Sequence, residues 1–231
     1  AISFPSGLTF AAVKAAIASS GAASDTANRT SWAVYDTAGR VAYAIDAGGA
    51  VTGFSYDTSG RVTKKVAYAN QRATSSLPTQ ADMNAWAAAN PAATDRTTRF
   101  YYDAMGQLRF TVDAEGYVSR TDYDAEGRVS ATYRYDTAVS ANDSWTIANL
   151  AGIADTYSST SITYDALGRV LFEYDAMGSV TYYWYRGNGQ LGWQSTAYGT
   201  ADQADTVFFY DEAGRVHTRV DANGTPEATA T

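Results

Sequence analysis

The sequence of 231 residues contains no cysteine, which excludes a disulfide scaffold, a thiol nucleophile and a thiolate metal site. Its single histidine excludes metal sites built from several histidines. The net charge of −7 argues against a partner that is a nucleic acid, because such proteins need an excess of basic charge. No apolar run approaches the roughly 20 residues of a membrane span. No signal peptide begins the sequence, so we expect a mature product or a fragment of a longer protein.

Tyrosine and glycine are abundant instead, with 18 and 19 residues, and they recur in a heptad of the form Tyr-Asp-x-x-Gly-[Arg/Gln]-[Val/Leu]. Successive copies within a block are 21 residues apart. The seven copies contain Tyr35, Asp36, Gly39 and Arg40; Tyr56, Asp57, Gly60 and Arg61; Tyr102, Asp103 and Gly106; Tyr123, Asp124, Gly127 and Arg128; Tyr164, Asp165, Gly168 and Arg169; the degenerate Tyr185 and Gly189; and Tyr210, Asp211, Gly214 and Arg215. Weaker half-copies with Asp-x-x-Gly lie between them at 45–49, 112–116, 174–178 and 220–224.

The half-period of 10 or 11 residues is the length of one strand and one tight turn. The aspartate of each copy can accept hydrogen bonds from backbone N–H groups of the turn, and the glycine tolerates a positive φ. The residues that follow each turn alternate, as Val41, Tyr43 and Ile45 do. We therefore predict a mainly β fold, an antiparallel β-hairpin repeat sheet of shell or solenoid type with short helical insertions.

The chain is expected to form a single repeat array over residues 1–231, with repeat blocks at about 30–68, 96–136, 158–191 and 206–224. Helices are expected at about 8–20, 80–90 and 143–154. Thr79 with Asp82, and Ser140 with Asp143, have the spacing of a capping box at the second and third of these. Trp86 and Trp145 are expected at similar places in their helices. A loop is expected from Gly192 to Thr206.

The heptads resemble the YD repeats of Rhs proteins, Tc toxin B and C components, wall-associated bacterial proteins and teneurins. The resemblance covers roughly residues 30–224. It implies long β-hairpin sheets that coil into a hollow shell, which encloses a toxin in the bacterial proteins and supports adhesion in teneurins. By this resemblance the chain is a non-enzymatic segment of a larger secreted or surface protein of bacteria. Its partners would be neighbouring repeats of the parent chain and an enclosed toxin.

Because they recur in every repeat, these residues are expected to have structural roles. We expect the tyrosines to pack as an aromatic ladder along one edge of the sheet, about 10 Å apart, and the arginines to pair with the repeat aspartates or to lie over tyrosine rings. Nearly every aspartate begins a turn, so a glycosidase pair or a calcium loop is not indicated. His217 lacks a partnered serine or aspartate in a recognisable context. No catalytic residue, cofactor or metal site is predicted.

A second hypothesis is a binding module for a carbohydrate or a protein. Aromatic residues cluster where the repeat is most degenerate, and aromatic rings stack on sugars. The candidate ligand-binding residues are Tyr183, Trp184, Tyr185 and Trp193. A surface glycan is the partner that this hypothesis implies. The same cluster could instead pack under the loop at 192–206.

Overall fold

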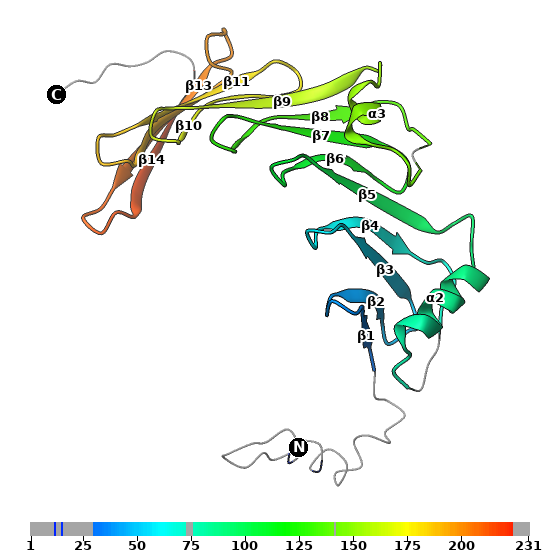
Figure 1. Cartoon of the computed structure of the whole chain (residues 1–231). Coiled ribbons are helices and arrows are strands. Elements are labelled where there is room, and N and C mark those ends of the chain that lie inside the picture. The colour runs from blue at the N-terminus through cyan, green and yellow to red at the C-terminus, as the bar shows by residue number, and fades with distance from the viewer. Residues whose placement is uncertain (1–11, 13–14, 16–29, 73–75, 141, 224–231) are drawn as a thin grey trace, which may run out of the picture. The chain divides into compact units, whose positions relative to one another are not determined.

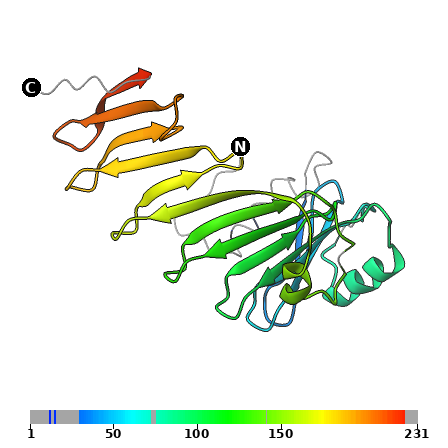
Figure 2. The same cartoon turned by 90° about the horizontal axis from the view of Figure 1, so that it is seen from above.

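The computed structural model describes residues 12, 15, 30–72, 76–140 and 142–223. The chain divides into two compact units, residues 1–98 and 99–231. Fourteen strands are described, and within each unit they follow one another in chain order (Figures 1 and 2). Every strand pairing described is antiparallel. The predicted antiparallel hairpin fold with short helical insertions is therefore confirmed.

The strands have nearly constant lengths, as the repeat spacing requires. The first unit contains β1 (Trp32–Tyr35), β2 (Val41–Ile45), β3 (Val51–Tyr56) and β4 (Val62–Ala67). β5 (Arg96–Tyr102) spans the boundary between the two units. The second unit contains β6 (Leu108–Val112), β7 (Val118–Tyr123), β8 (Val129–Tyr135), β9 (Tyr157–Tyr164), β10 (Val170–Tyr174), β11 (Val180–Tyr185), β12 (Leu191–Thr196), β13 (Ala204–Tyr210) and β14 (Val216–Asn223).

A small core lies on one face of the sheet in the first unit. Helix α2 (Gln80–Ala89) packs there through Met83, which is completely buried with Val34, Ile45 and Val51. The helix begins at the expected capping box, in which Thr79 and Asp82 each accept the backbone N–H of the other. A single helix thus covers a sheet face that would otherwise expose its apolar side chains to water.

The second unit repeats this arrangement with a shorter helix. Leu150 of α3 (Ile147–Ala151) is completely buried against Phe110, Val112 and Val118. The prediction of a helix over 143–154 with a Ser140–Asp143 cap is wrong in both extent and cap. Thr146 is the N-cap, and it forms a capping box with Asn149.

Tertiary contacts explain why the earlier cap does not form. Asp143 pairs with Arg99 of β5 at 3.0 Å. The backbone N–H and hydroxyl of Ser144 both donate to the side chain of Asn142, which closes a turn at that point. Trp145 consequently lies before the helix, whereas Trp86 lies inside its helix.

Two further expectations near the C-terminal end are corrected. The expected loop from Gly192 to Thr206 is mostly strand, because β12 extends to Thr196 and β13 begins at Ala204. The half-copy at 220–224 does not form a turn within the described residues, because β14 remains paired with β13 as far as Asn223. Asp221 accepts from Thr206 and Arg219 in place of turn N–H groups.

Of the expected helix at 8–20, only Ala12 and Ala15 are described, and the rest lies outside the described residues. Across the described ranges, none of the helices has the length and hydropathy that a membrane crossing requires.

Candidate functional site

The turns of full copies and half-copies share one construction. In five full copies and three half-copies, Oδ1 of the aspartate accepts the backbone N–H groups two and four residues later, at 2.8–3.1 Å. The glycine N–H donates to the aspartate carbonyl, as Gly39 does to Asp36 at 3.0 Å. The glycine φ is positive, +77° at Gly39 and +80° at Gly168. Each tyrosine of a full copy is the last residue of its strand, directly before the turn.

Arginine distinguishes the full copies from the half-copies. Its Nε donates to Oδ2 of the turn aspartate four residues earlier, at 2.7–2.8 Å in five copies. These hydrogen bonds and those from the turn backbone stabilise the charged carboxylate. The backbone N–H of the arginine is the largest cause that lowers the pKa of Asp36, Asp57, Asp165 and Asp211 below 3.8. At Asp124 burial is the largest single effect and raises the pKa, yet the hydrogen bonds from Arg128 outweigh it and the pKa is lowered.

Successive copies are joined by a contact that we call the repeat junction. The tyrosine hydroxyl of one copy donates to the backbone carbonyl of the residue after the arginine or glutamine of the preceding copy. Tyr56 donates in this way to Val41 at 2.8 Å, and Tyr164 donates to Val129 at 2.7 Å. The same bond joins Tyr123 to Leu108 and Tyr210 to Leu191, where glutamine replaces the arginine.

Where arginine is present, its guanidinium completes the repeat junction by lying over the tyrosine ring of the next copy. Arg128 is 4.3 Å from the ring centroid of Tyr164. The equivalent distances are 4.5 Å for Arg40 over Tyr56 and 4.4 Å for Arg169 over Tyr185. Tyr56 and Tyr164 are therefore each held by a cation and a carbonyl of the preceding copy. The expected ladder of stacked tyrosines is replaced by alternating rings and guanidinium groups. Among the described residues, the ring pairs recorded do not join two repeat tyrosines.

The degenerate copy keeps the turn but changes its chemistry. Arg186 stands where other copies have aspartate, and Gly189 keeps a φ of +87°. The guanidinium of Arg186 reaches away from the turn to the carbonyl of Phe208, at 2.8 Å. Its Nε is buried without a hydrogen-bond partner. Without an aspartate, this hairpin is closed by backbone hydrogen bonds from Arg186 to Gln190 and from Gly189 to Arg186, and by the side chain of Asn188, which bonds to Gln190.

The candidate ligand-binding aromatics do not form one surface. Strand alternation sends Tyr183 and Tyr185 to the face opposite Tyr182 and Trp184. Tyr183 donates to Glu173 at 2.6 Å, and burial together with this carboxylate raises the pKa of Tyr183 well above its usual range. Tyr185 lies under Arg169 in a repeat junction. Trp184 is directly opposite Trp193 across β11 and β12, and 47% of its surface is exposed.

The structure assembles an aromatic cluster around Tyr182, of which the sequence reasoning missed Phe172 and Tyr198. Tyr182 contacts Phe172 and Tyr198, each at 5.0 Å between ring centroids, and Trp193 at 5.5 Å. Tyr198 comes from the turn between β12 and β13, and its backbone N–H donates to the carbonyl of Val180. The sequence reasoning grouped Tyr182 with the aromatic residues that follow it, and the period-2 alternation of β11 was the signal that could have separated its face from that of Tyr183. The contribution of Tyr198 depends on a turn that the sequence analysis treated as part of a loop.

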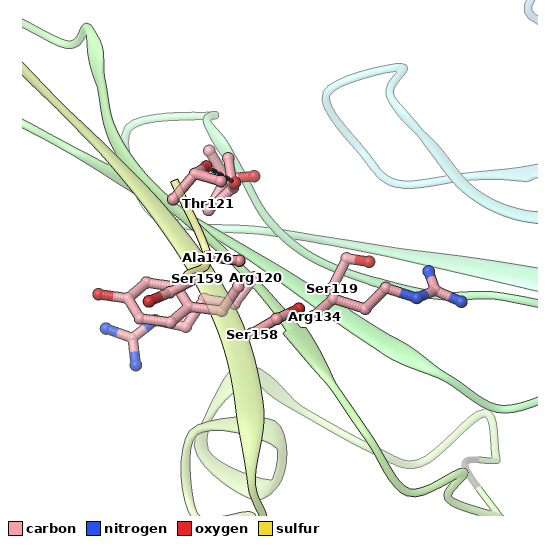
Figure 3. A pocket seen from close by; sticks show the side chains of 10 residues that line it. Ser119, Arg120, Thr121, Arg134, Ser158, Ser159 and Ala176 are labelled. Carbon is pink, nitrogen blue, oxygen red and sulfur yellow. Dashed lines mark hydrogen bonds between the residues drawn. The ribbon is translucent and has the colours of Figure 1, made fainter. Parts of the chain in front are cut away.

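A groove of about 310 Å³ crosses β7, β8 and β9, and seven of its ten lining residues carry a hydroxyl group (Figure 3). Thr132 and Thr160 share a hydrogen bond of 2.6 Å across it. The two arginines of its lining are already paired, Arg120 with Asp122 at 2.6 Å and Arg134 with Asp113 at 3.4 Å. The groove therefore presents neutral hydroxyls and compensated charge, which gives no basis for a strong anion site.

The described residues do not bring together a set of side chains that is typical of a catalytic or metal site. His217 is exposed, and its Nδ1 lies 2.7 Å from the hydroxyl of Thr218. Within the described ranges, no three histidine, aspartate or glutamate side chains gather as a metal site.

The turn aspartates predict a specific acid sensitivity. Because their folded-state pKa values lie below 3.8, their contribution to stability is complete above that pH and is lost as the pH falls through the lowered values. We expect the free energy of unfolding in urea to fall between about pH 4 and pH 2, with less loss in Asp165→Asn, which removes one such carboxylate. An unfolding free energy that is independent of pH over this interval would contradict the assignment.

Residues 35–73 match the family model described as RHS Repeat. The comparison with curated proteins gave no match. Among solved structures, the chain is similar to the Tc holotoxin pore of Photorhabdus luminescens, with 23% identity and a TM-score of 0.58 over 79% of this chain and 8% of that one. It is equally similar to TcdB2-TccC3 without its hypervariable C-terminal region, with 22% identity, a TM-score of 0.58 and the same coverage of both chains.

At this level of identity the likeness to the solved structures shows a common fold. The chain spans about 8% of the length of the solved chains that it matches. The match at 35–73 includes the first two full copies of the heptad, with their tyrosines, aspartates and glycines. The chain carries YD-type Rhs repeats, folded as in the Tc toxin structures.

Proposed function

We propose that this chain is a non-enzymatic segment of a larger secreted or surface protein of bacteria, in which it builds part of a β-shell that encloses or displays another domain. The repeat junction is the observation that carries this proposal. It uses the hydroxyl and ring of Tyr56 and Tyr164 and the guanidinium groups of Arg40 and Arg128 to join one copy to the next, so recurring residues of the heptad serve assembly.

The structural neighbours support the enclosure. Solved structures with this fold include a toxin pore and TcdB2-TccC3 assemblies, and each chain there is many times longer than this one. A wall of a shell needs strands that pair side by side, and the described hairpins pair in this way. The partners that follow are neighbouring repeats of the parent chain and an enclosed toxin.

Limited proteolysis of the longer protein that contains this array tests the proposal. We expect the enclosed domain to resist protease in the unmodified protein and to become cleavable when Arg128→Ala and Tyr164→Phe together open one repeat junction. Arg134→Ala is the matched control, because Arg134 is exposed and lies outside the junctions. Equal cleavage of the domain in the intact protein and in the opened variant would contradict enclosure.

A second candidate, glycan binding, is favoured by the exposed Trp184 beside the aromatic cluster. An exposed indole can stack on a sugar ring. Under this alternative, titration with bacterial polysaccharides produces a saturable change in tryptophan emission that is lost in Trp184→Ala. The matched control is Tyr35→Ala, an exposed aromatic of the first unit. Emission that does not respond to any of the polysaccharides would exclude the alternative.

A further inference from the structure

Both helical insertions cover the sheet through the same construction, which we call an anchored helix. A backbone N–H of the insertion donates to the carbonyl of a half-copy glycine. The threonine that caps the helix follows seven residues after this donor, and a completely buried apolar residue follows eleven residues after it. The donor, the glycine and the buried residue are Arg72, Gly49 and Met83 for α2, and Val139, Gly116 and Leu150 for α3. The equal spacing indicates that the anchor places the buried residue over the sheet.

Strands β10 and β11 are equivalent to the strands that these helices cover. Tyr174 pairs with Val180 beside the half-copy turn. The same register pairs Ile45 with Val51 and Val112 with Val118. Those four residues are at most 2% exposed beneath their helices, whereas Tyr174 is 37% exposed and Val180 is half-buried.

Tyr198 extends this part of the sheet. Its backbone N–H donates to the first residue of β11, as that of Tyr68 donates to the first residue of β3. Tyr68 is covered by Trp86 of α2, with 5.4 Å between the ring centroids. Tyr198 is 39% exposed, although aromatic side chains of β10 and β11 pack against it. We call Tyr174, Val180 and Tyr198 the uncovered face.

The described residues of the second unit do not supply a helix for the uncovered face. Between residues 142 and 223, α3 is the only helix described, and it packs on β6 and β7 (Figure 2). The insertions follow the fourth strand of a block, but the corresponding connection from β12 to β13 has only seven residues. This connection is too short for an anchored helix, in which eleven residues separate the donor from the buried side chain.

The half-copy turn beside the uncovered face has the conformation that holds an anchor elsewhere. Gly178 has a φ of +83°, compared with +87° at Gly49 and +93° at Gly116. Gly178 is exposed, and among the described residues no N–H is recorded on its carbonyl. Nothing lies within 4 Å of its Cβ position, whereas a Cβ at Gly116 would lie 2.5 Å from the carbonyl oxygen of Val139. An anchoring residue from another polypeptide can therefore reach the Gly178 carbonyl.

We propose that the uncovered face binds an anchored helix of a partner protein, whose backbone N–H donates to the Gly178 carbonyl and whose apolar side chain packs between Tyr174 and Tyr198. Both insertions of this chain cover the strands that directly precede them, so the insertion of a neighbouring repeat belongs to that repeat's own strands. A separate polypeptide is therefore the source of the helix. The proposal does not depend on whether the sheet encloses another domain.

The charge around the uncovered face determines the chemistry of the partner. Three aspartates lie at the end of the strands where the anchor binds, and they are Asp175, Asp202 and Asp205. The sequence has no lysine or arginine between Arg169 and Arg186, or between Arg186 and Arg215. A partner that complements this charge carries lysine or arginine on the flanks of its helix. The expected partner is therefore a basic amphipathic helix.

A peptide made from α2 provides the probe for the first test. Residues 70–91 contain the anchor, the cap and Met83, and Ala81→Lys, Ala85→Lys and Ala88→Lys make the exposed side of the helix basic. We expect the fluorescein-labelled peptide to bind the complete chain saturably, as measured by fluorescence anisotropy. Met83→Ser in the peptide should weaken binding about tenfold, because the apolar contact is lost. Omitting the three lysines or raising the salt concentration should also weaken it.

Gly178→Ala in the chain tests the anchor directly. Its Cβ would occupy the place of the anchoring residue, so we expect binding to weaken about tenfold or more. The matched control is Gly189→Ala, because Gly189 has a φ of +87° with nothing within 4 Å, but closes a turn at the opposite ends of the strands. Tyr174→Ser should also weaken binding, whereas Tyr35→Ser, at an exposed aromatic outside the uncovered face, should leave it unchanged.

Absence of saturable binding at the highest soluble peptide concentration would overturn the proposal. Binding that Gly178→Ala and Tyr174→Ser leave unchanged would also overturn it, because the peptide would then lie elsewhere. Two other occupants give different results. Self-association of the chain that is lost in Gly178→Ala would assign the face to a second copy, and displacement of the peptide by a bacterial polysaccharide would assign it to a glycan. Either result would replace the helix as the occupant.

These outcomes are separate from the test of enclosure. Limited proteolysis of the longer protein reports on whether a domain is shielded, and the peptide titration reports on one face of the sheet. A chain that binds the peptide but does not shield a domain would contradict the proposed function and leave this inference intact.

Discussion

Leu150→Ala is expected to lower the free energy of unfolding of the second unit by about 2–5 kcal/mol. Leu150 is completely buried, and it is the residue of α3 that fills the core formed by Phe110, Val112 and Val118. The helix has only five residues, so it cannot be stable by its own propensity. Alanine has the higher helix propensity, and the loss must therefore come from the cavity and from the detachment of α3.

Leu167→Ala is the matched control for this change. Leu167 is 77% exposed at the tip of a turn, and Ala38 occupies the equivalent position in the first copy. The control should change the unfolding free energy by less than about 0.5 kcal/mol. Urea denaturation followed by far-ultraviolet circular dichroism measures both variants. Equal stabilities of Leu150→Ala and Leu167→Ala would show that α3 does not hold the sheet face.

The hairpins could be predicted from sequence because their chemistry is local. Asp165, Gly168 and Arg169 lie within five residues of one another, and their contacts depend on the turn alone. The likeness to Rhs repeats followed from the same residues and is confirmed. The arginines were expected either to pair with the repeat aspartates or to cover tyrosine rings, and Arg40, Arg128 and Arg169 do both.

Long-range contacts determine the cap of α3 and the position of Asp221, which could not be predicted from the local sequence. Two successive capping patterns, Ser140–Asp143 and Thr146–Asn149, occur near the start of α3, and Asp143 of the first is bound by Arg99, 44 residues away in sequence. Asp221 had the spacing of a turn residue, but the length of β13 places it opposite Thr206. The aromatic cluster was misassigned for a different reason. Residues were grouped by proximity in sequence, although Tyr182 and Tyr183 point to opposite faces of one strand.

Gly116→Ala is expected to destabilise the second unit by roughly 2–5 kcal/mol, from a positive φ and a close backbone approach together. Gly116 has a φ of +93°, and a Cβ atom there would lie 2.5 Å from the carbonyl oxygen of Val139. The approach is itself a hydrogen bond, because the N–H of Val139 donates to the carbonyl of Gly116 at 2.8 Å. The segment that leads to α3 is attached to the sheet at this point, so a side chain would push it away.

Gly178→Ala isolates the cost of the backbone conformation. Gly178 closes the equivalent half-copy turn with a φ of +83°, and nothing lies within 4 Å of its Cβ position. Its replacement should cost about 1–2 kcal/mol. The difference between the unfolding free energies of Gly116→Ala and Gly178→Ala, measured by urea denaturation, therefore measures the attachment of the α3 segment. The equivalent bond in the first unit, from the N–H of Arg72 to the carbonyl of Gly49 at 2.7 Å, shows that the half-copy turns anchor both helical insertions. Equal losses in Gly116→Ala and Gly178→Ala would mean that the segment moves freely and that the turn does not anchor it.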